Sequence, residues 1–221
     1  MGRTIAIGDI HGCSEALRAL LAAVSPSAED TVVTLGDCVD RGPNSRGVLD
    51  QLLELQQRCH LVPLMGNHEL MMLSVLNGDF DLMMWQQYGG AETLASYQGE
   101  LSRITSEHRE FLANCRHFHE NDTHIFMHAN YVADVDLAQQ PGQVLFWMHM
   151  SSMLPPRHHS GKIAVVGHTP QIEGDVLNLG HLICIDTGCF ANGWLTALET
   201  TSGRIWQADQ GGQVRDGAGC R

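Results

Sequence analysis

The N-terminal third of the chain repeats one pattern three times: a short apolar run, a polar loop, and a return of apolar residues. The three apolar runs are Thr4–Ile7, Thr31–Leu35 and His60–Met65. Apolar residues at helical spacing follow the first two loops, namely Leu17, Leu20, Leu21 and Val24, and then Val48, Leu49, Leu52 and Leu53. Alternating strands and helices predict an α/β fold, and such sheets bind ligands in the loops at the carboxyl ends of their strands.

The rest of the chain changes from a helical pattern to a strand pattern. The segment from about Asn77 to Glu120 is predicted to be mostly helical, with an apolar stripe interpreted as core or cap: Phe80, Met83, Met84 and Trp85. Strands are predicted over Thr123–His128 and Ile163–Val166. Two hairpins are predicted, one from Val176–Leu179 and Leu182–Ile185, the other from Trp194–Leu198 and Arg204–Trp206.

The length of 221 residues suits a single domain with a sizeable core. We expect this domain to cover residues 1–207. Residues 208–221 are rich in glycine and have Val214 as their only aliphatic side chain larger than alanine, so they are predicted to form a flexible tail.

Composition narrows the class of partner. Hydrophobic residues make up 43% of the chain and charged residues 17%, which is typical of a folded globular protein. The 25 acidic residues against 13 basic ones disfavour nucleic acid or an anionic membrane as a partner. The segment Leu137–Pro156 has no charged residue but contains three prolines and several polar side chains, so it is interpreted as a buried or active-site segment rather than a membrane span.

Cysteine usage bears on the compartment. The seven cysteines are odd in number and scattered without a C-x-x-C pair, which favours free thiols over a disulfide framework. The chain enters its first apolar run directly after Met1-Gly2-Arg3, without the pattern of a secretory signal. We therefore expect a cytoplasmic protein.

Candidate chemistry is concentrated in the loops that follow the first three predicted strands. The loop residues are Asp9 and His11 after the first strand, Asp37, Asp40 and Arg41 after the second, and Asn67 and His68 after the third. Carboxylates crowded together at one sheet edge repel each other unless a cation lies between them. The three loops together therefore predict a metal site.

In these three loops the sequence resembles the phosphoprotein phosphatases, which are metal-dependent Ser/Thr phosphatases within the calcineurin-like metallophosphoesterases. The three loops match the signatures G-D-x-H-G, G-D-x-x-D-R-G and G-N-H-E in order and spacing. Further matches are Gly89-Gly90 with Thr93-Leu94-Ala95-Ser96-Tyr97, Met127-His128-Ala129, Gly167-His168-Thr169-Pro170 and Ile185-Asp186-Thr187-Gly188. The resemblance implies a central mixed β-sandwich flanked by helices, with the active site in loops at the strand ends.

The resemblance also implies a role for each matching residue. Asp9 and His11 would hold a first metal, Asp37 would bridge two metals, and Asn67, His128 and His168 would complete the second site. An oxygen and nitrogen ligand set favours two divalent ions such as Mn²⁺, with Fe or Zn²⁺ as alternatives. Water would attack phosphorus directly between the metals, without a phosphoenzyme.

Three further residues would complete the reaction. His68 would be the general acid, Asp40 would orient it, and Arg41 would bind the phosphate oxygens together with Asn67. Glu69 is expected to lie behind the ligands or to start a helix rather than bind metal.

One position departs from the family pattern. Where bacterial members carry an arginine that binds phosphate, this chain has His149 in the sequence Phe146-Trp147-Met148-His149. Three alternatives are open: His149 donates a hydrogen bond to phosphate, His149 is a surface residue without such a role, or Arg157 folds in from the Pro155-Pro156 turn to supply the missing charge. An imidazole lacks the five donors of a guanidinium group.

The substrate is predicted to be phosphoserine or phosphothreonine in proteins. Symmetrical dinucleoside tetraphosphatases share most of these motifs, so a dinucleoside polyphosphate or another small phosphate ester is the alternative. A third hypothesis is a non-catalytic phosphate-binding protein, for which His149 is the only support. A nuclease is disfavoured by the excess negative charge, and the sequence does not indicate an oligomeric state.

Overall fold

The computed structural model describes residues 2–216 and has an α/β fold built on two mixed β-sheets. Its strands and helices in the first half are β1 (Thr4–Ile7), α1 (Ser14–Val24), β2 (Thr31–Thr34), α2 (Ser45–Gln56), β3 (His60–Pro63), α3 (Asn67–Asn77), α4 (Leu82–Trp85), α5 (Ala91–Ser96) and α6 (Ser106–Ala113). Those in the second half are β4 (Phe118–Glu120), β5 (His124–Met127), α7 (Gly142–Trp147), β6 (Ile163–Val166), β7 (Leu177–Asn178), β8 (Leu182–Cys184), β9 (Asp186–Thr187), β10 (Trp194–Glu199), β11 (Ile205–Asp209) and β12 (Val214–Asp216).

The three predicted strand–helix units supply one half of the first sheet. Its order is β12-β11-β10-β1-β2-β3, with β9 paired to β10, and β1, β2 and β3 run parallel. The second sheet has the order β4-β5-β6-β8-β7, with a parallel centre of β5, β6 and β8. The candidate residues follow the carboxyl ends of five of these parallel strands, β1, β2, β3, β5 and β6.

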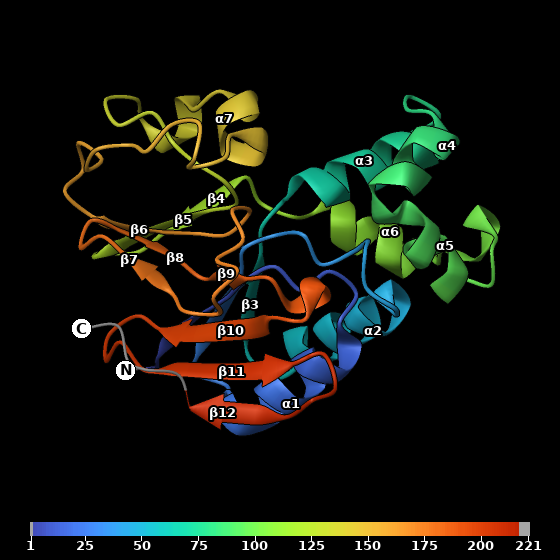
Figure 1. Cartoon of the computed structure of the whole chain (residues 1–221), viewed down its shortest axis with the longest axis horizontal. Coiled ribbons are helices and arrows are strands. Elements are labelled where there is room, and N and C mark those ends of the chain that lie inside the picture. The colour runs from blue at the N-terminus through green and yellow to red at the C-terminus, as the bar shows by residue number, and fades with distance from the viewer. Residues whose placement is uncertain (1, 217–221) are drawn as a thin grey trace.

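The two sheets pack face to face, and helices cover the first sheet (Figure 1). Successive side chains of a strand point to opposite faces, so each strand contributes to two layers. Ala6 and Val33 belong to the apolar cluster shared with Phe126 and Val165 of the second sheet, while their neighbour Ile5 packs toward the helices. The expected α/β sandwich flanked by helices is therefore confirmed.

Both predicted hairpins are present, since β7 pairs with β8 and β10 with β11 in antiparallel register. The apolar stripe is only partly core. Trp85 is completely buried, whereas Met83 and Met84 are 69% and 41% exposed. Only one face of the single-turn helix α4 therefore packs against the protein.

Part of the segment from residue 208, which was predicted to be a flexible tail, lies in strands. Residues 208 and 209 end β11, and β12 pairs with it through Ala208 and Val214. Backbone hydrogen bonds hold this edge strand, so it needs few apolar side chains, which is why an apolar pattern did not reveal it. Residues 217–221 lie outside the described residues, and the proposed single domain over 1–207 remains a prediction.

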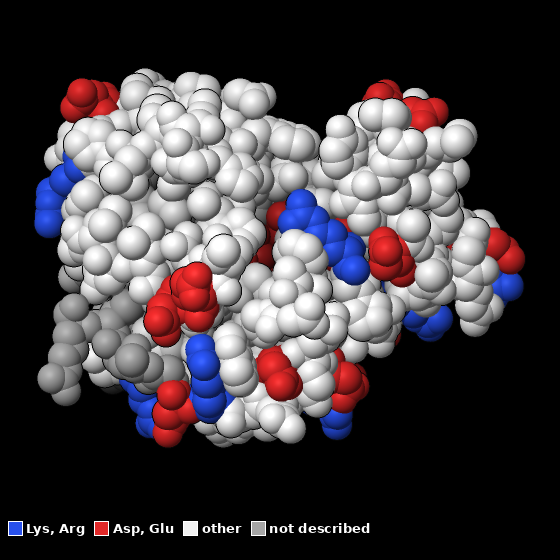
Figure 2. Space-filling model, in the orientation of Figure 1, with Lys and Arg blue, Asp and Glu red and all other residues white. Residues whose placement is uncertain are grey.

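The segment Leu137–Pro156 crosses the top of the second sheet as α7 and its flanking loops (Figure 1). Val144, Leu145 and Phe146 are buried, while Trp147 is exposed. No helix among residues 2–216 is both long and apolar enough to cross a membrane. Figure 2 shows a hollow between the α7 side of the molecule and the α3–α5 side, with acidic surface at its base and a basic side chain at its edge.

Candidate metal centre

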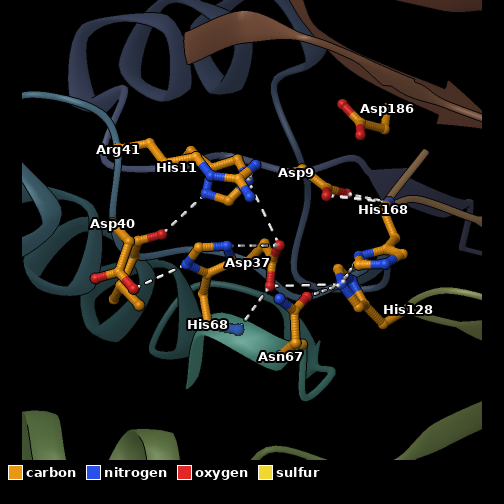
Figure 3. A network of polar contacts seen from close by, with 12 residues as sticks. Asp9, His11, Asp37, Asp40, Arg41, Asn67, His68, His128, His168 and Asp186 are labelled. Atoms are coloured by element: carbon orange, nitrogen blue, oxygen red, sulfur yellow. Dashed lines mark hydrogen bonds and ion pairs between the residues drawn. The ribbon is translucent and has the colours of Figure 1, made fainter. Parts of the chain in front are cut away.

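The predicted site residues, taken from both halves of the chain, come together at the ends of parallel strands (Figure 3). The loops after β1 and β2 supply Asp9, His11, Asp37, Asp40 and Arg41, and the first turn of α3, after β3, supplies Asn67 and His68. His128 directly follows β5 and His168 follows β6, in the second sheet. Both sheets thus contribute residues to one site at the carboxyl ends of their strands.

Asp37 occupies the middle of the arrangement. Its Oδ2 lies 3.4 Å from His11 Nε2, and its Oδ1 lies 3.4 Å from His128 Nε2. Two groups of candidate ligand atoms, each within 4.8 Å, share this carboxylate: one contains His11 and His68, the other His128 and His168. A carboxylate that faces one group with each oxygen has the arrangement of a bridging ligand.

The second group is the more complete. His128 Nε2 lies 3.0 Å from Asn67 Oδ1 and 3.1 Å from His168 Nδ1. His128 Nδ1 donates a hydrogen bond of 2.8 Å to the carbonyl of Leu35, which leaves Nε2 as the nitrogen with a free lone pair. Burial lowers the pKa of His128, and lowers that of His168 to about 3. Both imidazoles are therefore neutral near pH 7, as metal ligands must be.

On the other side of Asp37, His11 makes the same kind of hydrogen bond to a backbone carbonyl as His128 does. Its Nδ1 donates to the carbonyl of Val39 at 3.0 Å, so Nε2 carries the lone pair that faces Asp37. Burial lowers the pKa of His11 to about 3. Arg41 donates from Nη1 to this same Nε2 at 3.1 Å.

Asp9 lies in the site but outside both groups. Its carboxylate accepts the backbone N–H of His168, at 3.0 Å for the nearer oxygen. Burial, together with the charges of Asp186 and Asp37, raises the pKa of Asp9 well above its usual range. Buried carboxylates that repel each other in this way are an environment that a divalent cation would relieve, so the donor set fits the implied metals.

Glu69 holds two of the loops together without facing the ligand groups. Its buried carboxylate accepts backbone N–H groups from Gly66, Asp37, Cys38 and Val39, at 2.7–3.3 Å. Glu69 lies in the first turn of α3, which begins at Asn67, and the expectation that it does not bind metal stays a prediction. A Cβ on Gly66 would lie 2.2 Å from Asp37 Oδ1, so only glycine permits this close packing.

His68 and Asp40 form a buried pair next to the ligand groups. His68 Nδ1 donates to Asp40 Oδ2 at 2.8 Å. Burial lowers the pKa of His68, but the charges of Asp37 and Asp40 outweigh this effect and the net pKa is raised. Its Nε2 has no hydrogen-bond partner among the described residues and lies 3.9 Å from Asp37 Oδ2. The free nitrogen therefore faces the centre of the site.

Arg41 is exposed at the edge of the site, where its guanidinium lies 4.7 Å from the ring centroid of Phe190. Its backbone adopts a left-handed conformation with φ of 66°. Four other site residues share this uncommon conformation: His11, Asp37, Asp40 and His168. Such conformations cost free energy in non-glycine residues and concentrate at functional sites.

Of the two candidates for the missing arginine, the structure places His149 at the site. Its exposed ring lies 4.6 Å, centroid to centroid, from the ring of His168. Arg157 instead donates from Nη1 to the carbonyl of Gly161 at 2.9 Å, within its own turn.

Two residues that the sequence analysis did not assign also reach the site. Trp85 Nε1 donates to Asp40 Oδ2 at 2.8 Å, and Thr93 Oγ1 donates to Asp40 Oδ1 at 2.7 Å. The apolar pattern gave Trp85 a core role, and Thr93 was noted only as part of a motif. A tryptophan needs a partner for its N–H when buried, which was the available signal.

Comparison with known proteins agrees with this geometry. The profile of the calcineurin-like phosphoesterases matches residues 2–190. Serine/threonine-protein phosphatase 1 of Salmonella typhimurium is 31% identical over 209 residues, covering 86% of this chain and 88% of that protein. The symmetrical bis(5'-nucleosyl)-tetraphosphatase of Nitrosomonas europaea is 31% identical over 137 residues, covering 62% of this chain and 47% of that protein.

The extent of the likeness differs between relatives. The chain spans about a quarter to a half of the length of the tetraphosphatases that it matches. The crystal structure of a cold-active protein-tyrosine phosphatase from a Shewanella species has a TM-score of 0.69 at 19% identity, covering 98% of this chain and 80% of that one. This structural likeness concerns the fold alone. Because the family profile matches most of the chain and the Salmonella relative aligns with it over nearly its full length, the chain belongs to the calcineurin-like phosphoesterase family.

Proposed function

We propose that the protein is a phosphatase that depends on two divalent metal ions and hydrolyses phosphomonoesters, with phosphoserine and phosphothreonine in proteins as its substrates. The observation that carries the proposal is Asp37, which presents one carboxylate oxygen to His11 and the other to His128, each within its own group of candidate ligand atoms. The buried His68–Asp40 pair lies beside it.

The metal ligands proposed are those of the sequence analysis. Asp9, His11 and Asp37 would hold one ion, and Asp37, Asn67, His128 and His168 the other. Mn²⁺ suits these oxygen and nitrogen donors, as do Fe and Zn²⁺. When bound, the ions supply Lewis acidity that offsets negative charge on the phosphoryl group.

The remaining residues bind the substrate and move a proton. Arg41, at the edge of the site, would bind non-bridging phosphate oxygens through its planar guanidinium, and Asn67 and His149 would also contact the phosphate. His68 would donate the proton on Nε2 to the departing alkoxide, because its Nδ1 is occupied by Asp40. Asp40 would keep the ring oriented and charged, as a carboxylate does for other catalytic imidazoles.

The protein substrate is supported by the near full-length alignment with the Salmonella protein phosphatase. A second candidate, a symmetrical dinucleoside tetraphosphatase, is supported by several relatives of that name that share the motif-bearing part of the chain. Both candidates would use the same metal centre and the same general acid.

The test compares a phosphoserine peptide with diadenosine tetraphosphate at equal concentrations, across Mn²⁺, Mg²⁺, Fe²⁺ and Zn²⁺. We expect faster turnover of the peptide, loss of activity in a chelator, and a fall of at least about 100-fold for His68→Asn. His60→Asn, at an exposed position outside the site, is the matched control and should be fully active. Activity that survives metal removal would overturn the mechanism, and preferred turnover of the dinucleotide would overturn the substrate.

A further inference from the structure

Asp40 accepts more hydrogen bonds than orienting one histidine requires. It is completely buried, and its Oδ2 receives both His68 Nδ1–H and Trp85 Nε1–H, each at 2.8 Å. Its Oδ1 receives Thr93 Oγ1–H at 2.7 Å. The carboxylate is thus held at both oxygens by donors from α3, α4 and α5.

The hydrogen bonds of Thr93 leave little freedom for its hydroxyl proton. Its oxygen accepts the backbone N–H of Asp40 at 2.9 Å and lies 2.7 Å from Ser45 Oγ, which also accepts that N–H at 3.0 Å. With those contacts on the oxygen, the proton of Thr93 is directed to Asp40 Oδ1. Thr93 therefore fixes both the backbone and the side chain of Asp40.

The packing around the Trp85 ring holds its N–H toward Asp40 Oδ2. Its ring is fully buried, and a Cβ on Gly90 would lie 2.3 Å from ring atom Cδ2. The neighbouring Gly89 has φ of 106°, and its carbonyl accepts the backbone N–H of Arg41 at 2.9 Å. The Gly89-Gly90 pair thus joins the turn that carries Trp85 to the loop that carries Asp40 and Arg41.

These contacts matter because a carboxylate bound by one donor can rotate about its side-chain torsions, and the imidazole it orients moves with it. Asp40 in addition has a left-handed backbone with φ of 70°, a conformation that persists only when the surroundings impose it. Small losses of alignment at a proton-donating group lower the rate of the step that uses the proton.

We propose that Trp85 and Thr93 are positioning residues of the proton donor, which lock the Asp40 carboxylate so that His68 presents Nε2 to the leaving group. The inference rests on the proposed function, since it takes His68 as the general acid. Trp85 and Thr93 touch neither the substrate nor the candidate ligand atoms in this role; they act through Asp40.

The experiment uses the dependence of turnover on the leaving group. A phosphoserine peptide releases an alkoxide that must be protonated, whereas p-nitrophenyl phosphate releases a stable phenolate that leaves without an acid. Thr93→Val removes the donor at nearly constant volume, and Trp85→Phe removes the indole N–H. We expect each to lower kcat for the peptide by about 10- to 100-fold and kcat for p-nitrophenyl phosphate by less than about 3-fold.

Two comparisons separate positioning from a general loss of structure. Thr93→Ser keeps the hydroxyl and should restore peptide turnover to within about 3-fold of the wild type. Trp206→Phe removes a buried indole from β11, away from the site, and should affect the two substrates equally. In a His68→Asn background, Thr93→Val should cause no further loss, because residues that act through one group are not additive.

The results distinguish this inference from the proposed function. Equal losses on both substrates, or an additional loss in the His68→Asn background, would overturn the positioning role while leaving the phosphatase intact. A wild-type protein loaded with metal that turns over neither substrate would overturn the proposed function, and this inference with it.

Discussion

His128 and His168 approach each other with Nε2 of the first 3.1 Å from Nδ1 of the second, and Asp37 Oδ1 lies 3.4 Å from the same Nε2. Since Asp37 also faces His11, its loss should damage both metal positions, whereas the loss of His128 should damage one. We expect about two metal ions per chain in the wild type, about one in His128→Ala and close to none in Asp37→Asn. Elemental analysis of purified protein measures these contents.

The control for this prediction is His149→Ala, which removes the exposed imidazole next to His168 without removing a proposed ligand. It should retain the metal content of the wild type. Metal should also raise the unfolding temperature of the wild type but not that of Asp37→Asn, because only the folded wild type binds it. Equal metal contents in all variants would contradict the assignment of Asp37 as a shared ligand.

Glu69 should contribute to the stability of the folded protein although it is not a proposed metal ligand. Its two oxygens accept four backbone N–H groups from the loops that carry Asp37 and Asn67. Glu69→Gln replaces one acceptor by an NH₂ group that faces other donors, so we expect unfolding free energy to fall by about 2–3 kcal/mol. Urea unfolding measures this loss, and Glu107→Gln, on the exposed first turn of α6, is the control and should leave the free energy of unfolding almost unchanged.

How far the sequence determines the fold can be judged from particular elements. The strands with a pronounced apolar run, such as Thr4–Ile7 and Ile163–Val166, were predicted with their observed bounds because their side chains are buried. The edge strand β12 was missed, since Val214, Arg215 and Asp216 are all exposed, and the strand is held by backbone pairing and by polar contacts of Arg215 rather than by apolar burial. An apolar pattern reveals strands whose side chains are buried, and the side chains of an edge strand can all be exposed.

The same reasoning explains which site residues were found. Asp37 and His68 belong to short motifs that could be recognised in the sequence, and the structure brings the two residues together. Trp85 and Thr93 contact Asp40 through a fold in which α4 and α5 return to the second loop, more than 40 residues later in the chain. Such contacts depend on tertiary packing, which neither local periodicity nor motif spacing encodes.

Arg41 should show a trade-off between stability and function. Arg41→Gly and Arg41→Ala both remove the guanidinium, so both should raise KM for a phosphomonoester by about 10-fold or more. Because φ at this position is 66°, glycine relieves strain that alanine keeps, and Arg41→Gly should be more stable than Arg41→Ala by about 1 kcal/mol. Thermal or urea unfolding of the two proteins measures the difference.

The matched comparison is at Arg18, an exposed residue inside α1. There the order should reverse, with Arg18→Gly less stable than Arg18→Ala by about 1 kcal/mol, because glycine weakens a helix interior. An identical order at both positions would mean that backbone conformation does not govern the effect at Arg41.

Asp30 should contribute stability that depends on pH. Its buried carboxylate accepts hydrogen bonds from Arg3 and from the backbone of Ser27, and the bonds from Arg3 lower the pKa of Asp30 below its usual value. A lowered folded pKa gives stability that is complete above the unfolded pKa of about 4 and is lost as the pH falls through the folded value.

Asp30→Asn should therefore be less stable than the wild type by about 1–2 kcal/mol at pH 7, allowing for the partial exposure of Arg3. The gap should persist down to about pH 4 and narrow at lower pH. Urea unfolding at pH 7 and pH 3 measures it. Asp216→Asn, in an exposed pair with Arg204, should show no gap at either pH, and a gap for Asp30→Asn that widens in acid would refute the prediction.

His149 provides the most direct test of how this chain binds phosphate. Its ring lies 4.6 Å from that of His168, where a longer side chain could reach the proposed phosphate position with more donors. His149→Arg should lower the inhibition constant for inorganic phosphate by about 10-fold, since a bidentate charged contact contributes about 1.5 kcal/mol or more. His149→Lys should lower the inhibition constant less, because an ammonium group is a point charge without the planar fork.

Arg157→Ala should leave the inhibition constant for phosphate unchanged, because the guanidinium of Arg157 is hydrogen-bonded to the Gly161 carbonyl. A weaker affinity in Arg157→Ala, with no gain in His149→Arg, would instead assign the missing charge to Arg157.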